Sequence, residues 1–93
     1  MKNIDLDTVL ELDKQVDYHK GQIVSKTLKQ NDKVSMTLFS FSKGEEISSH
    51  ESDGDAMAIV LDGKGKFIVG EKEHLAEKGQ TLVMPKKVPH AVF

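Results

Sequence analysis

Short segments of alternating apolar and polar residues recur along most of this 93-residue chain and are separated by turn-forming residues. Period-two alternation is typical of β-strands that bury one face, whereas helices repeat every 3.6 residues. The expected strands lie at residues 23–24, 34–41, 57–61, 67–69, 74–76 and 81–84, with turns at 30–33, 53–55, 62–65, 70–73 and 77–79. Strands this short and evenly spaced predict a small antiparallel sandwich or barrel.

The first residues follow a different pattern. Leu6, Val9 and Leu10 recur at helical spacing, which predicts a short helix around residues 6–13 whose role is packing. A chain of this length has room for one domain with a modest core, because it buries well under about three-quarters of its unfolded surface. We therefore expect a single all-β domain over residues 1–93 with a short N-terminal helix.

Charge and composition exclude several classes of function. Thirteen basic and fifteen acidic residues leave a net charge of -2, and no basic stripe indicates nucleic acid as a partner. The N-terminus lacks the apolar stretch of a signal peptide, and no run approaches the roughly 20 apolar residues of a membrane helix. We expect a soluble cytoplasmic protein with no membrane contact. Because cysteine is absent, a metal ion would have to be held by histidine, carboxylate, hydroxyl or water.

The segment at residues 44–63 has the spacing of a known motif. Gly44 is followed by five residues and then His50, and Gly63 closes the segment. This arrangement resembles the first motif of the cupin superfamily, which reads glycine, five residues, His, one residue, His, three or four residues, Glu, six residues, glycine.

The segment at residues 79–93 resembles the second cupin motif, which reads glycine, five residues, Pro, one residue, glycine, two residues, His, three residues, Asn. Gly79, Pro85 and His90 keep that register. Lys87 replaces the second glycine, and the sequence stops before the Asn. The resemblance covers about half of the chain, and both motifs occur in the family's order.

Two of the family's four metal ligands survive in this sequence, His50 and His90. Ser52 stands at the position of the second histidine of the first motif, and Ala56 stands at the position of the glutamate. With the looser spacing the glutamate position falls on Met57, which cannot replace a carboxylate either. The resemblance therefore implies a degenerate metal site.

The resemblance implies a cupin-type double-stranded β-helix, or jelly-roll barrel, of the small single-domain conserved-barrel kind (cupin 2-like). Such a barrel brings His50 and His90 to one interior mouth, where a divalent ion (Zn, Ni, Fe or Mn) can take both imidazoles if each is neutral. Ser52, at an even offset from His50, is aimed better than its neighbours to join them. The expected ligand pocket is therefore marked by His50, Ser52 and His90.

Other interpretations of these residues stay open. The carboxylates Glu51, Asp53 and Asp55 lie close to His50 in sequence. A turn at residues 53–55 could bring one of them inward, although strict alternation directs odd offsets from His50 to the opposite face. The two histidines could also be hydrogen-bonded to each other or to water without any metal. His19 and His74 have strongly polar neighbours and are expected at the surface.

Two glycines near the middle of the chain, Gly63 and Gly65, are expected to form a hairpin. The final residues, 88–93, look like a strand that begins where the sequence ends. In the resembled family another strand follows, so the expectation is a barrel lacking one strand or a chain truncated at that strand. An unpaired edge invites pairing with a second chain, and we expect a homodimer.

The leading hypothesis is a small-molecule-binding cupin with a degenerate, weakly occupied divalent-metal site and no assigned catalytic residue. One alternative is a metal-dependent oxygenase or isomerase, which a carboxylate within coordination distance of both imidazoles would favour. Another is a non-catalytic dimeric sensor or structural module. Fold alone does not choose among them, because one fold hosts many functions.

Overall fold

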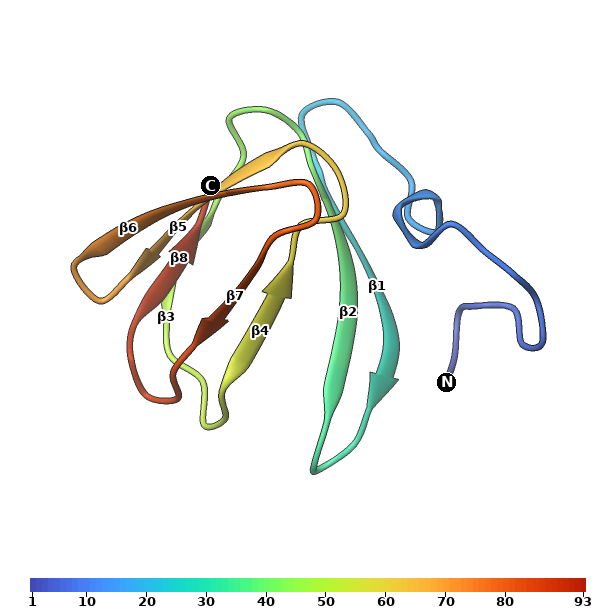
Figure 1. Cartoon of the computed structure of the whole chain (residues 1–93), viewed down its shortest axis with the longest axis horizontal. Helices are drawn as coiled ribbons and strands as arrows, with labels where there is room; N and C mark the ends of the chain where they lie inside the picture. Colours follow the sequence, from blue (N-terminus) through green and yellow to red (C-terminus); the bar gives the residue numbers. More distant parts are fainter. The chain divides into compact units, whose positions relative to one another are not determined.

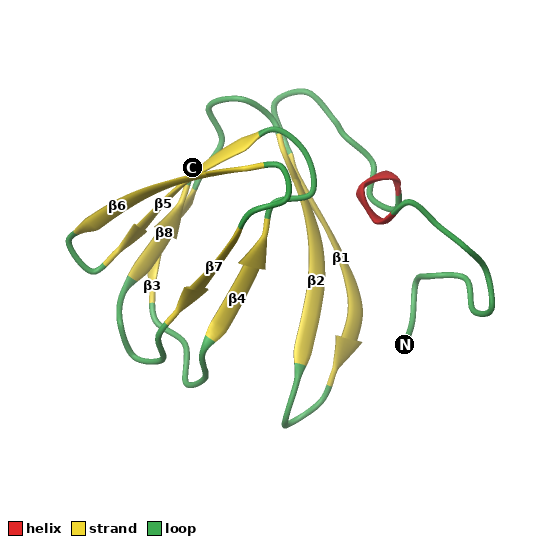
Figure 2. Cartoon of the chain, in the orientation of Figure 1, coloured by secondary structure: helices red, strands yellow, loops and turns green.

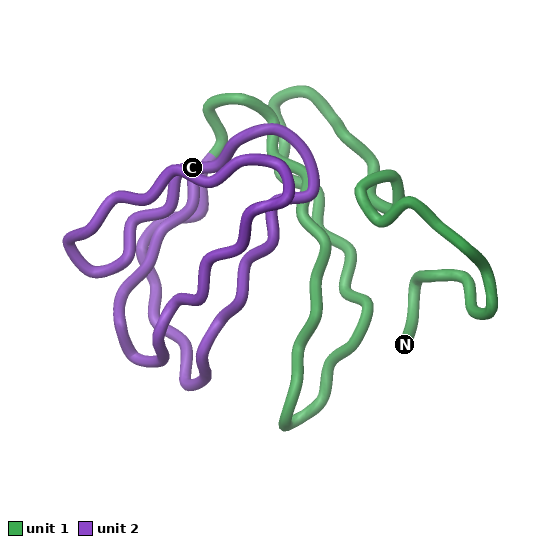
Figure 3. Tube along the Cα trace, in the orientation of Figure 1, with its two compact units in different colours: residues 1–45 green, residues 46–93 purple.

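The computed structural model describes residues 1–93. The chain forms two compact units, unit 1 (Met1–Glu45) and unit 2 (Glu46–Phe93) (Figure 3). Strands and connecting loops make up nearly all of both units (Figure 2). The all-β class predicted from the alternating pattern is confirmed.

Unit 1 is built on an antiparallel hairpin of β1 (Ile23–Gln30) and β2 (Ser35–Phe41) (Figure 1). The predicted turn closes this hairpin. Asn31 Oδ1 accepts hydrogen bonds from the backbone N–H groups of Lys33 and Val34, each at 2.7 Å. An asparagine side chain that bonds the backbone two and three residues ahead stabilises such a turn.

A β-bulge interrupts the hairpin between Thr27 and Lys29. The N-terminal residues bond the backbone at this point. The carbonyl of Leu28 accepts from the Lys2 N–H at 2.7 Å, and the carbonyl of Thr27 accepts from Asn3 Nδ2 at 2.7 Å. The bulge therefore attaches the start of the chain to β1.

The short N-terminal helix is a single 3-10 turn, η1 (Leu12–Lys14), and does not cover residues 6–11. Leu6 is 73% exposed and Val9 is fully exposed, so two of the three apolar positions that predicted a packed helical face cover no core, whereas Leu10 is partly buried. Without tertiary packing an isolated helix of this length is marginal in water.

Unit 2 contains two antiparallel sheets. The larger sheet has the order β3-β8-β5-β6, and the smaller one pairs β4 with β7. The strands are β3 (Ile47–His50), β4 (Ala56–Ile59), β5 (Lys64–Val69), β6 (Lys72–Glu77), β7 (Thr81–Met84) and β8 (His90–Val92). The expected final strand is thus present as β8, between β3 and β5.

The core of unit 2 lies between its two sheets. Phe67 on β5, Ala76 on β6 and Met84 on β7 are buried and form one cluster. Partly buried apolar residues from both sheets pack against them: Ala56, Ala58, Val60, Val69, Leu82 and Val92. We call the face of the larger sheet that carries Phe67 and Ala76 its inner face.

The expectation that Gly65 lies in a hairpin turn is wrong, because this residue lies within β5, opposite Ala76. A Cβ added at Gly65 would stand 3.1 Å from Cε1 of Phe67. The glycine therefore makes room for the Phe67 ring. Gly63, with φ of 74°, does adopt the left-handed conformation expected of a turn glycine.

The only helix, η1, has three residues. A membrane-spanning helix needs roughly 20 residues, so η1 could not cross a bilayer.

Candidate functional site

Two histidines meet on the inner face of the larger sheet. His50 ends β3, His90 begins β8, and the two residues are directly paired in register. Their ring centroids lie 4.3 Å apart in an edge-to-face arrangement. His90 is buried, whereas His50 is exposed. The sequence prediction that these two histidines come together is confirmed.

Each imidazole is held by a carbonyl of its own chain segment. Nδ1 of His50 lies 2.9 Å from the Ser48 carbonyl oxygen, and Nδ1 of His90 lies 3.3 Å from that of Val88. A carbonyl oxygen can only accept, so Nδ1 carries the proton in both rings. When the rings are neutral, each therefore keeps a lone pair on Nε2. Metal-ligating histidines are commonly oriented in this way, through a hydrogen bond from the other ring nitrogen.

The loops next to the two histidines are joined to each other. The Lys87 N–H donates to the Ser52 carbonyl at 2.8 Å, and the Lys86 N–H donates to Asp55 Oδ1 at 2.9 Å. Residues 51–55 follow His50, and residues 85–89 precede His90. These two bonds therefore fix the backbone from which both imidazoles project.

Lys87 adopts the left-handed backbone conformation, with φ of 60°. This is the position at which the second motif carries glycine, the residue that enters this conformation without steric cost. The loop thus keeps the backbone course of the motif although a lysine occupies the position. For a residue with a side chain the conformation costs about 1–2 kcal/mol.

The remaining candidates do not complete a set of metal ligands. The Ser52 hydroxyl donates to the Gly54 carbonyl at 2.7 Å. Asp55 bonds the opposite loop, and Glu51 and Asp53 are exposed. Nowhere in the chain do three or more His, Cys, Asp or Glu side chains gather closely enough to hold a metal ion. The structure therefore supplies two imidazoles at this point and no carboxylate.

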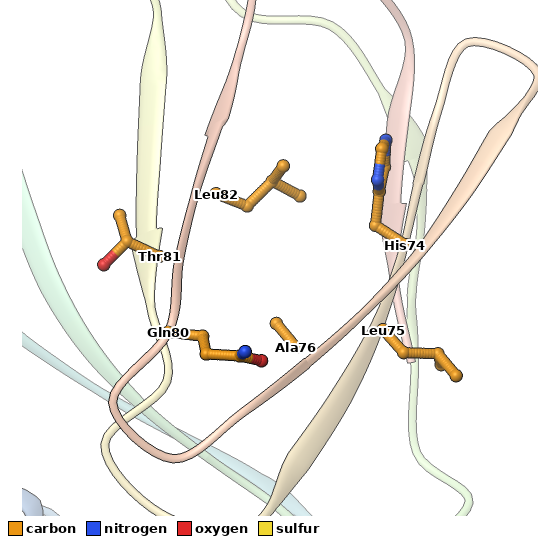
Figure 4. Close-up of a pocket in the computed structure, with 6 residues that line it drawn as sticks. All are labelled: His74, Leu75, Ala76, Gln80, Thr81 and Leu82. Atoms are coloured by element: carbon orange, nitrogen blue, oxygen red, sulfur yellow. The ribbon is translucent and has the colours of Figure 1, made fainter.

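A cavity of about 360 Å³ lies elsewhere in unit 2, next to β6 and β7 (Figure 4). Its lining residues are His74, Leu75, Ala76, Gln80, Thr81 and Leu82. None of the three residues predicted to mark the ligand pocket lines this cavity. The histidine pair and the cavity are thus separate features of the same unit.

His74 is half-buried, so the expectation of a surface position is wrong for this residue, whereas His19 is exposed as expected. His74 pairs directly with Phe67, and His90 pairs directly with Val69. Directly paired residues point to one face of a sheet, as do residues two apart on a strand. His74 therefore lies on the inner face together with the histidine pair.

The sequence did contain a signal for His74. It stands two residues before Ala76 within the predicted strand at 74–76, and Ala76 is buried. The period-two rule directs His74 inward only when Ala76, and not the more apolar Leu75, is taken as the buried position of this strand. Its polar neighbour Glu73 gave the opposite impression, although Glu73 alternates onto the other face of the sheet.

Comparison with known proteins places the chain in a family. The cupin domain family matches residues 37–93, which is more than half of the sequence. The chain belongs to the cupin family. Among solved structures, a conserved Streptococcus pyogenes protein of unknown function is 38% identical to this cupin, with a TM-score of 0.95. The match covers 98% of this cupin and 80% of the streptococcal chain.

Two further solved structures resemble this cupin. A cupin superfamily protein of Desulfitobacterium hafniense is 28% identical over 98% of this cupin and 84% of its own chain, with a TM-score of 0.92. A cupin 2 conserved barrel domain protein of Leptotrichia buccalis is 45% identical over 83% of this cupin and 37% of its own chain, with a TM-score of 0.81. No curated protein matches the sequence. The predicted cupin fold of the conserved-barrel kind is confirmed.

Proposed function

We propose that this cupin binds a small molecule in unit 2 and that His50 and His90 form a weak divalent-metal site at which this molecule is held. The observation that carries the proposal is the pairing of the two imidazoles. Their ring centroids are 4.3 Å apart, and both Nδ1 atoms bond carbonyl oxygens. Two Nε2 lone pairs on one face of a sheet are suited to a divalent ion of the zinc or nickel type.

The donor set fits a divalent ion only in part. Resident metal ions in enzymes typically have at least three protein ligands, whereas His50 and His90 supply two. We infer that water, the Ser52 hydroxyl or the bound molecule fills the remaining positions. A divalent ion held there would act as a Lewis acid toward an oxygen atom of the bound molecule. The chain's own contribution is to fix the two rings through the Ser48 and Val88 carbonyls.

Calorimetric titration of untagged protein with Zn²⁺ and with Ni²⁺ tests the metal site. We expect one ion per chain, and a loss of affinity of at least about tenfold in His50→Ala and in His90→Ala. The double variant should lose little more than either single variant, because one imidazole alone cannot chelate. His19→Ala removes an exposed histidine of unit 1 and serves as the matched control, with unchanged affinity.

Equal Zn²⁺ affinity in the natural protein and the double variant would contradict the proposal. The result would then favour the alternative of a non-catalytic module, in which the two histidines have only a structural role. Elemental analysis of the same untagged preparations provides a second measurement. Near-stoichiometric metal that disappears in the double variant would support the proposal.

A further inference from the structure

The inner face of the larger sheet carries nitrogen bases and no acidic side chain. On β6 the residues that alternate onto this face are Lys72, His74 and Ala76. The acidic residues of the same strand, Glu73 and Glu77, alternate onto the opposite face. There Glu73 pairs with Lys66 at 3.5 Å and Glu77 pairs with Lys64 at 3.9 Å.

The histidine pair continues this arrangement across the sheet. His50 and His90 lie on the inner face, and His90 is opposite Val69, which in turn is opposite Lys72. Four basic side chains therefore share this face, and no acidic side chain does. An anionic ligand on this face therefore meets no side chain of like charge.

The polar groups around the cavity offer hydrogen-bond donors. Gln80 accepts a bond of 2.9 Å from the Glu77 backbone N–H. A backbone N–H requires an acceptor, so the bonded atom is Oε1, and the Gln80 amide N–H₂ remains as a donor. His74 forms no hydrogen bond with the protein, so its ring N–H is also free to donate to a ligand.

The rest of the cavity lining is mainly apolar. The side chains of Ala76 and Leu82 extend into the space between β6 and β7, and Ala76 lies near the end of the Gln80 side chain (Figure 4). Leu82 and Ala76 also pack with the core of unit 2. At about 360 Å³ the cavity is within the roughly 300–1,000 Å³ range typical of small-molecule sites. Apolar walls with a few converging donors suit a molecule that has an apolar body and an acceptor group.

We propose that the cavity lined by His74, Ala76, Gln80 and Leu82 binds an organic carboxylate with an apolar body. The apolar body lies against Ala76 and Leu82, and the carboxylate accepts hydrogen bonds from His74 and the Gln80 amide. This inference goes beyond the proposed function, because the cavity is separate from the histidine pair and is a second place where a small molecule binds. The cavity itself needs no metal ion to bind a carboxylate.

Three probes of nearly equal size separate charge from shape: phenylacetate, the neutral 2-phenylacetamide and the cationic 2-phenylethylamine. Each is titrated into the full chain at pH 7 with EDTA present, and backbone amide shifts are followed by two-dimensional NMR. We expect phenylacetate to shift the amides of residues 74–76 and 80–82 and to bind about tenfold more tightly than the amide. The amine should bind least.

His74→Leu tests the role of the imidazole. Leucine places an apolar side chain opposite Phe67 and removes the hydrogen-bond donor. The affinity for phenylacetate should therefore fall about tenfold, as expected for the loss of one hydrogen bond to a charged group. His74→Asn retains a donor and should recover part of the loss. His19→Ala should bind as the natural protein does. The amide spectrum of each variant shows whether it is folded.

The inference is overturned if no probe binds, if the amide or the amine binds as tightly as phenylacetate, or if folded His74→Leu keeps full affinity for phenylacetate. Because EDTA removes metal ions, these results do not depend on the histidine pair. Zinc binding that fails while phenylacetate binds would refute only the metal part of the proposed function. The reverse result would refute only the carboxylate site.

Discussion

Replacing Lys87 with glycine should stabilise the protein relative to the same replacement at Lys86. Lys87 has φ of 60°, whereas Lys86 has no positive φ. The left-handed conformation costs a residue with a side chain about 1–2 kcal/mol, and glycine avoids this cost. Glycine also loses about 0.5–1 kcal/mol through its greater freedom in the unfolded chain, and this loss is common to both variants.

The two variants are closely matched. Both remove one exposed lysine from the same loop, and both keep the backbone N–H that bonds the loop at residues 52–55. Lys87→Gly should therefore change stability by between about 0 and +1.5 kcal/mol, and Lys86→Gly by about -0.5 to -1 kcal/mol. The difference of about 1–2 kcal/mol corresponds to a melting-temperature difference on the order of 10 °C.

Urea denaturation and thermal melting, both followed by circular dichroism, measure this difference. Lys87→Val is a third variant, and it should be the least stable of the three because a β-branched residue is strongly disfavoured in the left-handed region. Equal stabilities of Lys86→Gly and Lys87→Gly would refute the reasoning. That result would mean that the backbone at residue 87 does not require the conformation that glycine provides.

Two further predictions concern residues that shape unit 2. Asp55→Ala should cost about 1 kcal/mol of unfolding free energy because it removes the acceptor of the Lys86 N–H, while Asp55→Asn, which keeps an Oδ1 acceptor, should cost less; equal losses in urea denaturation would contradict this role. Gly65→Ala should cost about 1–3 kcal/mol, since its Cβ would stand 3.1 Å from the buried Phe67 ring. In the double variant Gly65→Ala/Phe67→Leu the added cost of the alanine should shrink, and a cost that is unchanged would show that the Phe67 ring is not its cause.

Much of unit 2 could be predicted from the sequence because the positions of its strands and turns depend mainly on residues that are close in sequence. Alternation located β4 to β7, and the spacing from Gly44 to His50 and from Pro85 to His90 identified the two residues that meet. The conformations of Gly63 and Gly79 also follow from turn chemistry, and both have positive φ. These features depend on neighbouring residues or on a motif whose register the chain keeps.

The errors arose where distant residues decide the structure. Gly65 looked like part of a turn, but its position is set by the ring of Phe67, which packs over the strand. The short N-terminal helix is present as η1, but its expected span of residues 6–13 depended on a core that would cover Leu6 and Val9, and both are exposed. His74 was placed by its polar neighbours in sequence, whereas its pairing with Phe67 across the sheet directs it inward.

The histidine pair also depends on information that spacing does not contain. The motif spacing could predict that His50 and His90 lie close together, but it could not predict which nitrogen of each ring is free. That follows from the bonds to the Ser48 and Val88 carbonyls, which depend on the local course of β3 and β8. The hydrogen bond from the Lys86 N–H to Asp55 Oδ1 also depends on the local course of the chain. It gives this aspartate a structural partner in place of a metal ion.

Long-range ¹H–¹⁵N NMR of the histidine rings, recorded before and after one equivalent of Zn²⁺, tests the central claim most directly. Before zinc, and at a pH where the rings are neutral, His50 and His90 should both carry their proton on Nδ1 and have an unprotonated Nε2. After zinc, the Nε2 resonances of these two residues should shift together, while those of His19 and His74 stay in place. Nε2-protonated rings before zinc, or zinc shifts absent from His50 and His90, would contradict the account.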